Sequence, residues 1–100
     1  MFGDLMGNLE EQQNQMKAKL LQVVISESVQ GITVSGNATK TIDSINIDET
    51  LFAEGDKEML EELLLLCVNR FIEKAIQVEA EESQKLMETM LPPGFGDLFK

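Results

Sequence analysis

The chain has 100 residues, of which 43% are hydrophobic and 26% are charged, which is typical of one small folded domain. Eighteen acidic residues against eight basic ones give a formal net charge of −10, so local basic groups would have to hold any polyanionic partner. With no histidine and one cysteine, the sequence excludes an intrachain disulfide and a Cys-His nucleophile pair, and we expect no metal, no cofactor and no enzymatic activity. The sequence contains no apolar run of membrane-spanning length and no basic signal-peptide start, so we expect a cytoplasmic protein without membrane contact.

The first predicted element is a helix over residues 4–22. Leu9, Met16 and Val23 recur at seven-residue intervals, and the stretch from Leu9 to Gln22 contains neither proline nor glycine. The apolar row resembles a seam against another helix, but it is too short for a coiled coil, and packing on the protein core is the favoured interpretation.

Residues 23–48 are predicted to form a three-stranded antiparallel meander, because Val, Ile, Thr and Ser alternate there. The two turns are expected at Gln30-Gly31 and at Gly36-Asn37. The expected strands are Val23–Val29, Ile32–Gly36 and Thr39–Asp48. A sheet this small has two free edges, which favour association with a second copy of the chain.

The third strand has an irregular apolar pattern. Ile45 and Ile47 share one face, whereas Ile42 is out of phase with them. The sequence therefore predicts either a bulge near Asp43 or a strand that is apolar on both faces.

A long helix is predicted over residues 56–90, with Asp56 as its N-cap. Leu60, Leu64 and Phe71 lie on one apolar stripe and are candidates for the core or a dimer contact. Cys67 lies on the same stripe, so a buried small side chain is favoured over a reactive thiol.

The far end of this helix is predicted to extend beyond its own domain. Thirty-five residues span about 50 Å, more than the diameter of roughly 35 Å expected for a compact chain of this length. Residues 79–85 also lack an apolar face, and Pro92-Pro93 ends the helix. Residues 91–100 then form a short tail.

Several sequence motifs together resemble the YbaB/EbfC family of small bacterial nucleoid-associated proteins. The motifs are Met1-Phe2-Gly3, the Gln-rich segment 12–16, Ile42–Asp48 running to Leu51, Asp56–Leu63 with Leu91–Phe95, and Asn69 within the long helix. The resemblance covers essentially the whole chain and makes residues 1–100 a single domain of that family.

The resemblance implies an α+β fold with the order α-β-β-β-α. It further implies a tweezer-like homodimer in the cytoplasm, at the nucleoid, that binds double-stranded DNA. We expect this binding to be weak, salt-sensitive and largely independent of sequence, because nothing in the chain resembles an element that reads bases.

If DNA is bound, a small set of cations must contact its phosphates. The candidates are Lys17, Lys19, Lys40, Arg70, Lys74 and Lys85. Arg70 and Lys74 share a helix face. A solvated face with internal ion pairs, such as Glu81 with Lys85, is the alternative interpretation of these charges.

The competing function is an acidic dimeric module that binds a protein partner and has lost DNA binding. Composition alone favours this alternative. The carboxylate clusters at Glu58, Glu61 and Glu62 and at Glu79, Glu81 and Glu82 are interpreted as solvated helix faces, because no loop with metal-ligand spacing accompanies them.

Overall fold

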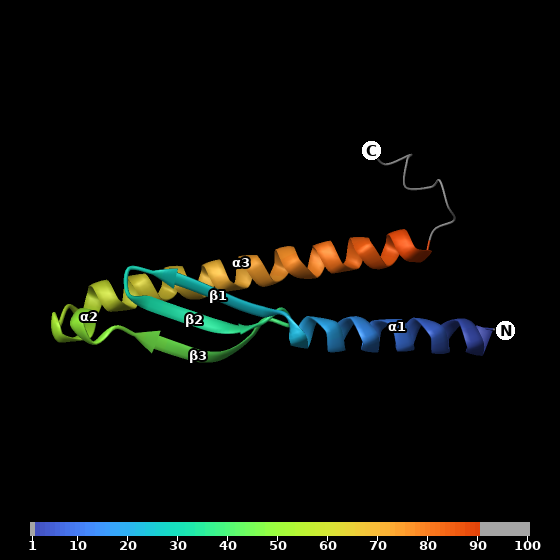
Figure 1. Ribbon diagram of the computed structural model, residues 1–100, viewed down its shortest axis with the longest axis horizontal. Helices are drawn as coiled ribbons and strands as arrows, with labels where there is room; N and C mark the ends of the chain where they lie inside the picture. Colours follow the sequence, from blue (N-terminus) through green and yellow to red (C-terminus); the bar gives the residue numbers. More distant parts are fainter. Residues whose placement is uncertain (1, 91–100) are drawn as a thin grey trace.

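The structure, a computed structural model, describes residues 2–90 and shows the predicted order of helix, three strands and long helix (Figure 1). One short helix, not predicted from the sequence, follows the last strand. The elements are α1 (Phe2–Gln22), β1 (Val24–Val29), β2 (Ile32–Asn37), β3 (Thr41–Ile47), α2 (Glu49–Ala53) and α3 (Lys57–Met90). The predicted tail, residues 91–100, lies outside the described residues.

The three strands form one antiparallel sheet in the order β1-β2-β3. The first turn is at Gln30-Gly31, as predicted, and both residues have positive φ angles of 43° and 95°. The sheet lies at one end of an elongated molecule that measures 62 × 32 × 18 Å (Figure 1).

The second turn was predicted at the wrong residues. Gly36 and Asn37 pair with β3, and the turn follows them at residues 38–40, where Asn37 Oδ1 accepts a hydrogen bond of 2.9 Å from the Thr39 amide. Gly36 is required for another reason. A Cβ atom there would lie 1.9 Å from the Thr41 carbonyl oxygen and 2.9 Å from Cζ of Phe71. This glycine marks close packing rather than a turn.

A bulge in β3 explains its apolar pattern, which confirms one of the two predicted alternatives. Ser44 pairs with Ser35 and Ile42 pairs with Gly36, which leaves Asp43 without a partner in β2. The extra residue restores the phase, so that Ile42 shares a face with Ile45. The strand begins at Thr41, two residues later than predicted.

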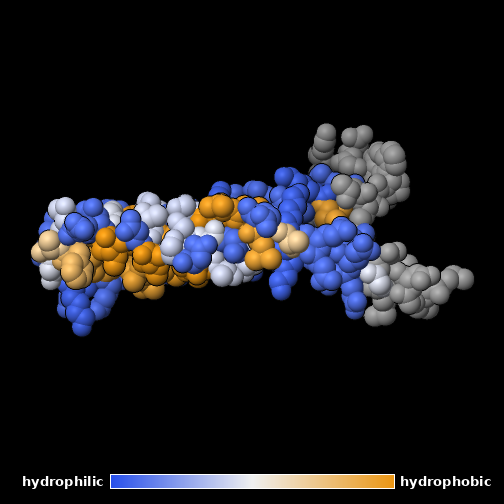
Figure 2. Space-filling view, turned by 60° about the horizontal axis from the view of Figure 1, so that its bottom comes forward, coloured by the Kyte–Doolittle hydropathy of each residue, from blue (hydrophilic) through white to orange (hydrophobic). Residues whose placement is uncertain are grey.

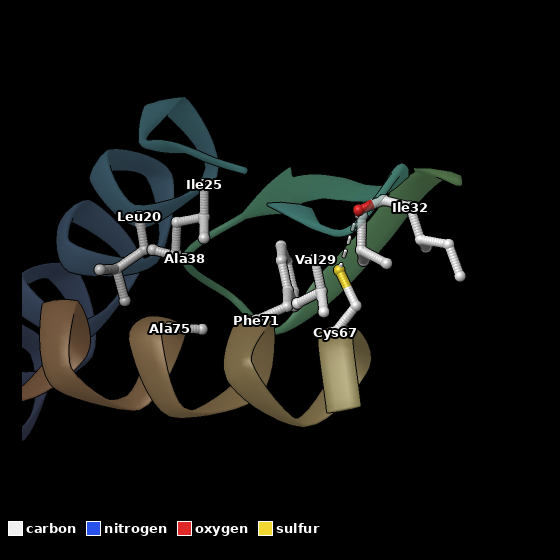
Figure 3. Packing of buried hydrophobic residues seen from close by; sticks show 9 residues of the cluster. Leu20, Ile25, Val29, Ile32, Ala38, Cys67, Phe71 and Ala75 are labelled. Atoms are coloured by element: carbon white, nitrogen blue, oxygen red, sulfur yellow. Dashed lines mark hydrogen bonds between the residues drawn. The ribbon is translucent and has the colours of Figure 1, made fainter. Parts of the chain in front are cut away.

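The core lies between α3 and the strands β1 and β2 (Figure 3). Cys67, Phe71 and Ala75 of α3 are completely buried against the sheet. The single S–H donor of Cys67 faces two backbone carbonyl oxygens, that of Glu27 at 3.1 Å and that of Ile32 at 3.6 Å. The prediction that Cys67 is buried is therefore confirmed.

The beginning of α3 was correctly predicted. The Met59 amide donates a hydrogen bond of 3.0 Å to Asp56 Oδ1, so Asp56 is the N-cap and Lys57 is the first helical residue. The start of α1 was predicted two residues late, because this helix begins at Phe2.

The molecule has two regions, the body and the arm. The body consists of the sheet, α2 and residues 57–77 of α3. The arm consists of residues 7–19 of α1 and residues 78–88 of α3, which extend beyond the sheet in the same direction (Figure 1). None of the helices within residues 2–90 combines the length and the hydrophobicity that a membrane-spanning segment requires.

Candidate nucleic-acid interface

The six cations predicted to contact DNA fall into two groups. Arg70 and Lys74 lie on α3 in the body. The other four lie on or beside the arm: Lys17 and Lys19 on α1, Lys85 on α3, and Lys40 in the β2–β3 turn. The two groups also differ in their ion pairs.

In the arm, Lys19 and Lys85 share one carboxylate. Lys19 Nζ lies 2.7 Å from Oε2 of Glu82, and Lys85 Nζ lies 3.5 Å from Oε1 of the same residue. Lys19 comes from α1, whereas Glu82 and Lys85 come from α3, so this cluster joins the two helices of the arm.

The lysines favour the charged form of Glu82. The hydrogen bond from Lys19 lowers the pKa of the Glu82 carboxyl below its ordinary value, and the positive charges of Lys19 and Lys85 act in the same direction. Partial removal from water opposes this shift. Glu82 is therefore ionised at neutral pH.

A second ion pair lies at the base of the arm. Lys40 Nζ donates a hydrogen bond of 2.7 Å to Oε2 of Glu79. Lys40 has a φ angle of 68°, and this left-handed turn residue connects the sheet to α3 through its side chain. Lys17 lines a shallow hollow near Glu79 and Thr39, and it forms no ion pair with the described part of the chain.

Arg70 and Lys74 are exposed cations one helical turn apart, as their spacing predicts. They line a hollow beside β1 together with Glu27, Glu73 and Gln77. Within residues 2–90, neither cation forms an ion pair with the neighbouring carboxylates. Both are therefore available to a phosphate.

The ion pair suggested between Glu81 and Lys85 is wrong. Lys85 contacts Glu82, and Glu81 accepts a hydrogen bond of 3.2 Å from Nε2 of Gln77. The spacing on α3 allowed either pair. Lys19 on α1 attracts Glu82, and this carboxylate then lies beside Lys85 as well.

Glu79 and Glu82 were not predicted as partners of the candidate cations. No local pattern could have paired Lys40 with Glu79, because the two residues are 39 positions apart, whereas the three-residue spacing of Glu82 and Lys85 on one helix did allow their pair. The polar stretch 79–85 also indicated a surface that needs no apolar cover.

The three apolar residues proposed for the core or a dimer contact lie at different depths. Phe71 is completely buried within the single subunit. Leu60 and Leu64 are half-buried and pack against the same core.

An apolar surface lies beside β3, where α3 gives little cover. Val34 of β2 is completely buried, but its β3 partner Ile45 is 50% exposed. Leu65 and Ile76 of α3 are also exposed. They lie on a different flank of α3 from Arg70, which faces the β1 side. Figure 2 shows hydrophobic residues in a band along the body, whereas the arm is mostly hydrophilic.

Comparisons with known proteins agree with this fold. The sequence model of the YbaB/EbfC DNA-binding family matches residues 1–90. A nucleoid-associated protein of Flavobacterium johnsoniae is 36% identical over 103 residues, covering 96% of this chain and 95% of its own. A nucleoid-associated protein of Koribacter versatilis is 30% identical over 96 residues, covering 94% and 95% of the two chains.

A solved structure supports the fold independently. The crystal structure of an uncharacterised protein of Helicobacter pylori superposes with a TM-score of 0.69 at 20% identity, covering 91% of this chain and 94% of that one. Together with the match over residues 1–90, these similarities show that the chain belongs to the YbaB/EbfC DNA-binding family.

Proposed function

We propose that this protein binds double-stranded DNA at the nucleoid as a homodimer, through phosphate contacts with little sequence preference. The observation that carries the proposal is the family match over residues 1–90. Exposed Arg70 and Lys74, which have no ion pair among the described residues, supply the first contacts. Phosphate contacts of this kind orient a protein on DNA but carry no sequence information directly.

The net charge of −10 per chain does not prevent such binding. At about 0.1 M salt, interactions between exposed charges more than roughly 10 Å apart are largely screened. A phosphate beside Arg70 therefore interacts mainly with the charges near it. These include Glu27 and Glu73, so we expect weak affinity.

The homodimer is proposed to form through the apolar surface beside β3. Ile45, Leu65 and Ile76 would be covered by the same surface of a second copy, as two-fold symmetry requires. The free edge of β3 adds unpaired backbone groups that favour association with another chain. In such a dimer the two arms would project beyond the paired bodies.

Binding is tested by titrating a fluorescent duplex with protein at salt concentrations from about 50 to 200 mM. Affinity should fall by orders of magnitude over this range and should differ little among duplex sequences. The double variant Arg70→Gln/Lys74→Gln should bind much more weakly. The control Thr50→Glu/Ala53→Glu changes the net charge by the same amount at exposed positions of α2, away from both Arg70 and the free edge of β3, and should bind nearly as well as the wild type.

The dimer is tested by sedimentation equilibrium at low micromolar concentration. The wild type should have about twice the 11.2 kDa chain mass. Ile45→Asp should yield monomers, because it places a charge in the proposed contact. Met87→Asp, which changes an exposed apolar residue of the arm, should remain dimeric. A wild-type monomer would contradict the proposed dimer.

A second candidate function is favoured by the ion pairs of Lys19, Lys40 and Lys85, which leave few free cations on an acidic chain. It is a dimeric module that binds a basic protein partner and not DNA. Absence of duplex binding at about 50 mM salt would favour this candidate, because phosphate contacts are strongest at low salt.

A further inference from the structure

The cluster of Lys19, Glu82 and Lys85 has an unusual distribution of exposure. The side chain of Glu82 is only 12% exposed, whereas those of Lys19 and Lys85 are 60% and 65% exposed. The anion is therefore sheltered between the helices of the arm, and the two cations reach into solvent around it.

The cations converge from two different helices on one small anion. Lys19 contacts one oxygen of the carboxylate and Lys85 the other. Gln12 and Gln15 of α1 line the same groove, which has a volume of about 200 Å³. Each ammonium group has three N–H donors, so each keeps donors for a second anion from solvent.

We propose that Lys19 and Lys85 form a phosphate site in the groove between α1 and α3, and that Glu82 occupies this site as an internal substitute for phosphate. This inference rests on the proposed function, because the phosphate would come from the backbone of bound DNA. Glu82 then limits how strongly the arm binds a duplex.

The charges support this assignment. A carboxylate and a phosphodiester each carry one negative charge and accept hydrogen bonds from ammonium groups. A phosphate at the same position would meet two cations and one competing anion. Removing the charge of Glu82 leaves the two cations without their present partner, whereas removing the charge of Glu81 releases no lysine.

Lys40 and Glu79 form a weaker version of the same arrangement. Only one lysine contacts Glu79, and both side chains are similarly exposed, at 43% and 42%. Glu82 therefore differs from Glu79 in two respects: it contacts two lysines, and its side chain is much less exposed. The effect on DNA binding should be larger at Glu82 than at Glu79.

The first test compares Glu82→Gln with Glu81→Gln. Both variants change the net charge of α3 by the same amount at adjacent positions. Glu82→Gln should bind a duplex roughly tenfold more tightly at about 50 mM salt, and its salt dependence should steepen because up to two more cations per arm contact phosphates. Glu81→Gln should resemble the wild type. Equal gains in the two variants would show an effect of net charge alone and overturn the proposal.

The double variant Lys19→Gln/Glu82→Gln distinguishes two causes of tighter DNA binding by Glu82→Gln. One is the release of Lys19 to contact a phosphate, and the other is the loss of the contact between α1 and α3. The double variant removes the same contact between α1 and α3 but leaves Lys85 as the only released cation. Most of the gain in affinity should disappear. If the double variant binds as tightly as Glu82→Gln, the gain does not come from Lys19 and the two-lysine site is wrong.

Inorganic tripolyphosphate tests the site without DNA. In Glu82→Gln, titration should shift the side-chain NMR signals of Lys19 and Lys85, and in Glu81→Gln the shifts should be much smaller. If these signals do not move in Glu82→Gln, the phosphate site is wrong even where the wild type binds DNA through Arg70. If they move but no variant binds a duplex, the phosphate site is supported and the proposed DNA-binding function fails.

Discussion

The body and the arm are stabilised by different kinds of contact. In the body, Phe71 and Cys67 are completely buried beneath the sheet, and the geometry is tight enough to require glycine at position 36. In the arm, α1 and α3 are joined by the ion pair of Lys19 and Glu82 around a groove open to solvent. The body therefore depends mainly on the removal of apolar surface from water, whereas the arm combines apolar contacts of Met16 and Val78 with ion pairs.

This difference suits the proposed roles of the two regions. A packed interior has few alternative arrangements, so the body can hold a fixed dimer surface. Exposed ion pairs are individually weak and sensitive to salt, so the arm can exchange an internal carboxylate for an external phosphate.

The largest contrast is expected in thiol reactivity. Cys67 should react with a thiol reagent at least roughly a thousandfold more slowly in the native protein than in denaturant, because labelling requires opening of the body. A cysteine placed in the arm, Met87→Cys in a Cys67→Ala background, should react almost as fast as in denaturant, since Met87 is 62% exposed. Rapid native labelling of Cys67 would contradict its buried position.

Truncation of Phe71 should strongly destabilise the body. Phe71→Ala removes a completely buried ring and should lower the free energy of unfolding by about 3–5 kcal/mol, which is enough to unfold much of the protein. Chemical denaturation measures this loss. Met87→Ala in the arm is the matched control and should change the free energy of unfolding little, because Met87 is exposed. A loss as large as that of Phe71→Ala would show that the arm is packed as tightly as the body.

The same glycine substitution should have opposite effects in the two regions. Gly36→Ala places a Cβ atom against the Thr41 carbonyl and the Phe71 ring and should cost about 1–3 kcal/mol or more. Gly7→Ala in α1 meets nothing within 4 Å and should stabilise the helix by up to about 1 kcal/mol. Thermal unfolding of both variants should show a lower melting temperature than the wild type for Gly36→Ala and a higher one for Gly7→Ala. Destabilisation by Gly7→Ala would show that the arm is packed more tightly than proposed.

The smallest effect is expected from the pH dependence of the arm. The pKa of Glu82 is lowered in the folded protein, so its contribution to stability is complete above the ordinary glutamate pKa of about 4.3 and is lost as the pH falls through the lowered pKa. Lys19 from α1 and Lys85 from α3 are the charged groups that contact it. The difference in melting temperature between wild type and Glu82→Gln should be constant near neutral pH and vanish in acid. An unchanged difference at low pH would mean that it does not arise from this charge.

Much of the fold was predictable because its signals are local. Asp56 identified the start of α3, and the phase of Ile42 indicated either a bulge or a strand apolar on both faces, of which the bulge is correct. The apolar stripe through Cys67 and Phe71 predicted burial, since helical spacing alone places these residues on one face. The five-residue helix α2 was missed, because it has no buried side chain and no side-chain cap to signal it.

The candidate site depended on tertiary structure. The amino-acid sequence was enough to identify the cations and to place Arg70 and Lys74 on one face, because helix geometry follows from spacing. It did not determine which cations are already paired, since the partner of Lys19 lies on another helix. Only the packing of α1 beside α3 brings Glu82 between two lysines, so Lys19 and Lys85 are paired, whereas Lys17, Arg70 and Lys74 have no ion pair among the described residues.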